Sequence, residues 1–130
     1  MFVPGKQVRP LVAVFVLVSC LAPGIARAGW PHDPNSGNVP LCTAANQQYS
    51  STIVSDGAGG AIVTWYDIRS GNYDIYAQRV NAAGVPQWTA NGVALCTAAN
   101  NQYSPTIVSD GAGGAIVTWY DYRSGTYADI

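Results

Sequence analysis

Apolar and polar residues alternate along residues 61–67, where the order Ala-Ile-Val-Thr-Trp-Tyr-Asp predicts a β-strand. The alternation places the Ala, Val and Trp side chains on one face and the Ile, Thr and Tyr side chains on the other. Both faces are therefore largely apolar. A sheet built from such strands must be covered on both sides, which predicts that sheets stack against one another.

Three more strands are expected around this one, at 51–55, 74–80 and 85–88. The Asp-Gly-Ala-Gly-Gly sequence at 56–60 predicts a tight turn, because glycine accepts positive φ angles and aspartate can bond backbone N–H groups two residues on. Four antiparallel strands with turns about every ten residues form one blade of a β-propeller, with the first strand at the axis and the fourth at the rim.

Residues 41–73 return almost unchanged at 95–127, with a period of 54 residues from Cys42 to Cys96. A period of this length, rich in β-branched and aromatic residues, is typical of propeller blades, whereas helical repeats would show apolar spacings of three and four. The predicted fold class is all-β, with antiparallel four-stranded blades of an incomplete β-propeller.

The expected organisation has about two blades, the second of which is truncated. Because closed propellers need about four to eight blades, we expect the chain to be a fragment of a longer protein. The predicted divisions are a signal peptide (1–28), an N-terminal segment or seam strand (29–40), repeat 1 (41–94) and truncated repeat 2 (95–130).

Three motifs carry a family resemblance: Ile-Val-Ser-Asp-Gly at 53–57, Gly-Ala-Ile-Val-Thr-Trp-Tyr-Asp at 60–67 and Asp-Ile-Tyr-Ala-Gln-Arg at 74–79. They resemble blades of secreted bacterial sialidase-like propellers and of repeat arrays in bacterial surface proteins. The resemblance implies the blade fold. It does not extend to sialidase activity, because the turn at 81–88 lacks the Ser and Asp of the sialidase Asp box and the chain has no glutamate to partner a tyrosine nucleophile.

The N-terminus reads as an export signal, with a basic front (Lys6, Arg9), an apolar stretch at 11–22 and an Ala-Arg-Ala cleavage site at 26–28. We expect a secreted or cell-surface protein. The alternative is a lipoprotein, because Leu-Val-Ser-Cys at 17–20 resembles a lipobox; a lipidated Cys20 would be the link to a membrane.

Without residues 1–28 the chain has three arginines against seven aspartates, a net charge of −4. Nucleic-acid binding requires a basic surface, so this class of partner is excluded. Cys42 and Cys96 occupy the same place in the two repeats. Equivalent positions of neighbouring repeats lie too far apart for a disulfide, and we expect both to be small apolar residues.

The candidate ligand-facing loops follow the second strand of each repeat. Their structural alternative is that each aspartate caps its loop and pairs with the arginine two residues later. Tyrosines at the same strand end, Tyr66, Tyr120 and Tyr122, are candidates for an exposed platform. Trp65 and Trp119 are expected in the core between blades. The candidate residues are Asp67, Arg69, Asn72, Asp74, Tyr120, Asp121, Tyr122 and Arg123.

No metal or cofactor is expected. Asp56 and Asp110 each bring one carboxylate to a turn, far from the six to eight oxygens that calcium takes, and His32 has no nearby ligand partner. The predicted function is a non-enzymatic secreted module for adhesion, scaffolding or recognition of a glycan or protein, with further blades of the same chain as partners. The alternative is the propeller part of a glycoside hydrolase or lyase with catalytic residues elsewhere; a calcium-stabilised surface array is a weaker one.

Overall fold

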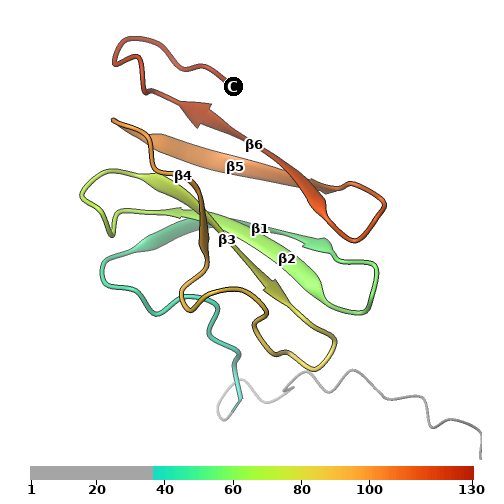
Figure 1. Cartoon of the computed structure of the whole chain (residues 1–130). Coiled ribbons are helices and arrows are strands. Elements are labelled where there is room, and N and C mark those ends of the chain that lie inside the picture. Colours follow the sequence, from blue (N-terminus) through green and yellow to red (C-terminus); the bar gives the residue numbers. More distant parts are fainter. Residues whose placement is uncertain (1–36) are drawn as a thin grey trace, which may run out of the picture.

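The computed structural model describes residues 37–130, and within this range the chain is all-β, with six strands and no helix. Four strands form one antiparallel sheet in the order β1-β2-β3-β4, and β5 pairs with β6 in a second sheet (Figure 1). The predicted antiparallel all-β class is confirmed. The strands are β1 (Gln48–Ser55), β2 (Ala61–Asp67), β3 (Asp74–Val80), β4 (Val93–Cys96), β5 (Gln102–Ser109) and β6 (Ala115–Asp121).

The two central strands of the first sheet, β2 and β3, have the bounds that the sequence predicts. The turn between β1 and β2 also forms as expected: the Asp56 Oδ1 atom accepts hydrogen bonds from the N–H groups of Ala58 (2.9 Å) and Gly60 (2.8 Å). Asp110 makes the same two bonds in the second repeat, at 2.7 and 2.9 Å. Both aspartates therefore shape turns, and Asp56 also pairs with Arg79.

The first strand starts at Gln48, three residues earlier than the expected 51–55. The pairing with β2 shifts register between Tyr49 and Thr52, and Ser50 has a φ angle of 48°. This is a β-bulge, which lets the strand continue past one unpaired residue. The second repeat has the same bulge, with Ser104 at a φ angle of 56°.

The fourth strand was predicted at the wrong place. In 85–88 only Pro86 forms a bridge, with Val80, while β4 lies at Val93–Cys96 and pairs with β3. Proline has no N–H group for a ladder, and the left-handed pair Asn91 and Gly92 (φ angles of 66° and 87°) turns the chain back along β3 before pairing begins. As a result β4 contains the first residues of the second sequence copy.

The two sheets pack face to face, with β5 lying across β1, β2 and β3 (Figure 1). On its other face the first sheet carries a buried cluster of Val63, Trp65 and Tyr76, against which Leu41 and Cys42 pack. The first sheet is thus covered by the second sheet on one side and in part by this segment on the other. Trp65 is 3% exposed, but it lies in this cluster rather than between the two sheets, where a core position between blades was expected. Within 37–130 the sheets stack without closing into a ring.

The expected export signal, Cys20 and His32 lie outside the described residues. Over 37–130 the chain has no helix of a length and apolar character that would cross a membrane.

Candidate functional site

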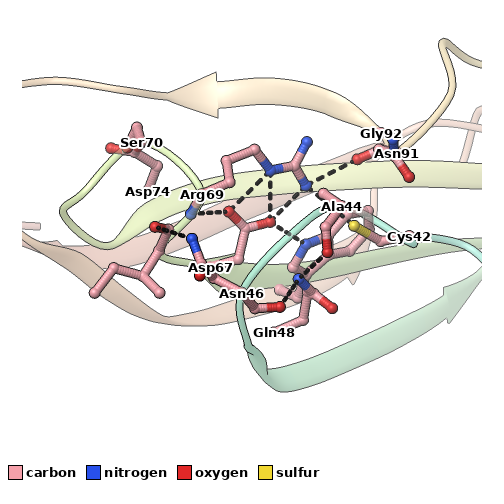
Figure 2. Close-up of polar contacts among 12 residues, drawn as sticks. Cys42, Ala44, Asn46, Gln48, Asp67, Arg69, Ser70, Asp74, Asn91 and Gly92 are labelled. Carbon is pink, nitrogen blue, oxygen red and sulfur yellow. Dashed lines mark hydrogen bonds and ion pairs between the residues drawn. The ribbon is translucent and has the colours of Figure 1, made fainter.

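Asp67 ends β2 with a side chain that has no exposed surface. Its Oδ2 atom accepts a hydrogen bond from the Trp65 indole N–H (3.0 Å), and its Oδ1 atom accepts one from the backbone N–H of Arg69 (3.2 Å). The Arg69 Nε atom lies 2.9 Å from both carboxylate oxygens (Figure 2). The carboxylate thus caps the loop and pairs with the arginine, which is the structural role set out as the alternative to ligand binding.

The far end of Arg69 reaches beyond its own loop. The Nη2 atom donates to the Cys42 sulfur (3.2 Å) and to the Asn91 carbonyl oxygen (3.0 Å), and Figure 2 shows both partners around the guanidinium. Burial opposes the positive charge, but the hydrogen bond and charge of Asp67 outweigh it, so the pKa of Arg69 is raised. We call Asp67, Arg69 and Cys42 the first latch, since they join the segment before β1 to the end of β2.

Asp121, Arg123 and Cys96 repeat this arrangement and are called the second latch. The Arg123 Nε atom donates to Asp121 Oδ2 (2.8 Å), and its Nη2 atom lies 3.6 Å from the Cys96 sulfur. The Arg123 hydrogen bond is the main reason that the pKa of Asp121 falls to about 2. Cys96 belongs to β4 of the first sheet and Asp121 to β6 of the second, so the second latch connects the two sheets.

Of the two remaining candidates of the first repeat, Asn72 contacts the next repeat and Asp74 holds Asn72 in place. The Asn72 amide donates to Asp74 Oδ1 (3.1 Å), to the Ala98 carbonyl oxygen (3.2 Å) and to the Asn100 carbonyl oxygen (2.5 Å). Asp74 is 1% exposed and also accepts a hydrogen bond from Ser70. The loop between β2 and β3 is therefore fastened to the connection between β4 and β5. A ligand-facing role for the four candidates of the first repeat, Asp67, Arg69, Asn72 and Asp74, stays a prediction.

The two candidate tyrosines of the second repeat are not brought together. Tyr120 lies on the open face of β6 and is 49% exposed, whereas Tyr122, just after β6, stacks on Tyr103 with ring centres 5.3 Å apart. Tyr122 follows the last residue of β6, so it does not continue the strand face on which Tyr120 lies. They do not form one platform.

Tyr122 instead belongs to a tyrosine cluster that sequence reasoning missed. Rings from both repeats form a continuous chain of contacts, with centres 5.2–6.4 Å apart and all of them partly buried. The hydrogen bond with Tyr122 raises the pKa of Tyr103. The repeated Gln-Tyr-Ser sequence at 48–50 and 102–104 was the available signal. Within 37–130 the cluster consists of Tyr49, Tyr66, Tyr73, Tyr103 and Tyr122.

Cys42 and Cys96 are both free thiols, and each is partly buried. Each sulfur contacts an arginine, which differs from the purely apolar role expected of both residues. Over the described range no three His, Cys, Asp or Glu side chains gather as metal ligands would.

Searches of known protein families, curated proteins and solved structures found no match to the chain.

Proposed function

We propose that the chain is a non-enzymatic, exported β-propeller repeat module that acts as a scaffold at the bacterial surface. The observation that carries the proposal is the second latch. Arg123, the candidate ligand-binding cation of the second repeat, makes its contacts with Asp121 and with Cys96 of the neighbouring sheet. The second latch joins β4 of the first sheet to the end of β6 in the second, and a stack of blades requires such contacts between neighbouring units.

The architecture supports the propeller part of the proposal. The first sheet is an antiparallel meander of four strands, and the second sheet packs on its face. Propeller blades bury both of their faces. Ile62 and Trp65, on opposite faces of β2, are each 3% exposed; the second sheet covers the face of Ile62, and Leu41 and Cys42 cover Trp65. The family resemblance and the expected export signal agree with this assignment.

Recognition of a glycan or protein is assigned, within the proposal, to the tyrosine cluster. Tyrosine offers an apolar ring and a polar hydroxyl, and the partly buried rings expose part of each to solvent. Asp67 lacks any exposed surface with which to meet a ligand.

Hydrogen–deuterium exchange of the full chain tests the scaffold role. Arg123→Gln removes the ion pair with Asp121 and the contact with Cys96, so we expect faster exchange in β4 and in the residues after β6. Arg69→Gln is the matched control, because it breaks the equivalent contacts of the first latch and should affect residues 40–43 and 91–92 instead.

Binding to a glycan array tests whether the Asp121–Arg123 pair holds the two sheets together or recognises a ligand. If Arg123→Gln keeps wild-type exchange in β4 and β6 but loses the binding of a glycan that wild type retains, the pair recognises a ligand and the scaffold proposal is wrong. If Arg123→Gln loosens β4 while Tyr73→Ala abolishes glycan binding, both parts of the proposal hold.

A further inference from the structure

Identical residues in the two sheets differ sharply in exposure. Ile62 of β2 is 3% exposed, whereas Ile116, its equivalent in β6, is 58% exposed. Thr64 has no exposed surface, and its equivalent Thr118 is exposed. Each strand pairs with the first strand of its repeat in the same register, but β2 also pairs with β3, whereas β6 has β5 as its one strand partner within 37–130. The difference therefore reflects both the strand beside β2 and what lies on top of each strand.

We define the forward face of each sheet as the side that carries these residues. The Thr52 hydroxyl on the forward face of the first sheet donates to the Pro105 carbonyl oxygen of β5 at 3.4 Å, and the rings of Tyr66 and Tyr103 lie 6.2 Å apart. The second sheet therefore covers this face. The forward face of the second sheet holds Thr106, Val108, Ile116, Thr118 and Tyr120.

The opposite side, the rear face, shows the reverse difference. Ile53 on the rear face of the first sheet is 65% exposed, whereas its equivalent Ile107 on the second sheet is partly buried. Among residues 37–130 the two sheets thus meet in one contact, between the forward face of the first sheet and the rear face of the second. Within the same range one forward face and part of one rear face are left open.

We propose that a second copy of this chain docks the rear face of its first sheet onto the open forward face of the second sheet. This inference rests on the proposed function, since it extends the same stacking from one chain to two. The new contact would continue the established interface with the equivalent side chains of β5 and β6, without an equivalent of β3, which β5 contacts inside the chain. Ser51 would stand where Pro105 stands inside the chain. Such a contact is heterologous, so it leads to rings or open chains of copies rather than to a symmetric dimer.

Leu41 and Cys42, which cover part of the rear face of the first sheet, do not obstruct this docking. Leu41 and Cys42 pack beside Val63 and Trp65, next to a recess of about 260 Å³. The equivalent residues of the second repeat, Leu95 and Cys96, lie in the contact between the two sheets. The Cys96 sulfur is 3.9 Å from Asp121 Oδ2, and Leu95 lines a recess together with Val117. Leu41 and Cys42 are therefore part of the surface that a stacked sheet presents.

Two charge substitutions at exposed positions test the proposal by sedimentation velocity on the full chain. Ile116→Lys blocks the forward face of the second sheet, and Ile53→Lys blocks the rear face of the first. We expect wild type to form larger species as its concentration rises and each variant alone to stay monomeric, with association weakened by at least about tenfold because a charge would be buried without a partner. An equimolar mixture of the two variants should form dimers and nothing larger, since one open face remains on each partner.

Circular dichroism melts establish that both variants fold, as expected for residues with 65% and 58% exposure. The proposal is overturned if wild type stays monomeric up to about 100 μM, if Ile53→Lys associates as strongly as wild type, or if the mixture shows no dimer. A failure of the scaffold role would be seen in a different measurement, the hydrogen–deuterium exchange of Arg123→Gln. That experiment uses protein at low concentration, where the chain is a monomer.

Discussion

The Arg69 guanidinium lies over the ring of Tyr76, with its central carbon 3.7 Å from the ring centre. The same group pairs with Asp67 and donates to Cys42, so one side chain of the β2–β3 loop contacts β3 and the segment before β1. Only a planar cation with several N–H donors can stack and make these bonds together.

Arg69→Lys should therefore destabilise the protein although it keeps the charge. We expect a loss of about 1–2 kcal/mol in the free energy of unfolding, measured by urea denaturation. Arg123→Lys is the control at the equivalent position, where the side chain is 57% exposed against 21% for Arg69, and it should cost no more than about 0.5 kcal/mol. Equal losses would mean that stacking on Tyr76 contributes nothing.

Ile62→Ala and Ile116→Ala make the same change at equivalent positions of the two repeats. The first removes a side chain that is buried between the sheets and should cost about 2–4 kcal/mol. The second removes one that is 58% exposed and should change stability by less than about 0.5 kcal/mol when measured on dilute protein. Similar costs at the two positions would contradict the stacking of the second sheet on the first.

Gly92→Ala should be one of the most damaging single changes in the chain. Gly92 has a φ angle of +87°, and an added Cβ atom would lie 2.5 Å from Trp65 Cη2 and 2.7 Å from the Ala77 carbonyl oxygen. We expect a loss of about 3 kcal/mol or more, since backbone strain adds to a clash with the core. Gly71→Ala is the control: its φ angle is +107° but no atom lies within 4 Å, so the strain alone should cost about 1–2 kcal/mol. A thermal melt of each variant compares them.

The second latch should weaken in acid. Asp121 has a pKa of about 2 in the folded chain against an ordinary value of 3.8, so its contribution to stability is complete above pH 4 and is lost as the pH falls through 2. Because Arg123 is mostly exposed and solvent screens the pair, we expect the contribution to be about 1 kcal/mol.

Urea denaturation between pH 7 and pH 2 checks this, with Asp121→Asn as the reference. Asp56 and Asp110 also have lowered pKa values, each chiefly through a hydrogen bond from the backbone of its own turn, and they titrate in both proteins. The stability difference between wild type and variant therefore isolates Asp121. It should shrink below pH 4, and a difference that grows in acid would refute the ion pair.

Local patterns were enough to predict the class, the repeat and the central strands. The alternation in 61–67 and the turn at 56–60 depend on interactions between residues close in sequence, so β2 and its turn form where the sequence predicts them. The capping of the loop by Asp67 was also foreseeable, since the aspartate and Arg69 are two residues apart.

Tertiary structure decided the rest. The edge strand is Val93–Cys96 rather than 85–88 because its backbone must meet β3 after the turn at Asn91 and Gly92, a geometry that composition does not reveal. The tyrosine cluster joins residues up to 73 positions apart, from Tyr49 to Tyr122. Ile62 and Ile116 show the limit most directly. The same residue in the same local sequence is buried where a third strand lies beside it and another sheet covers it, and exposed where both are missing within 37–130, so its burial is decided by its tertiary neighbours.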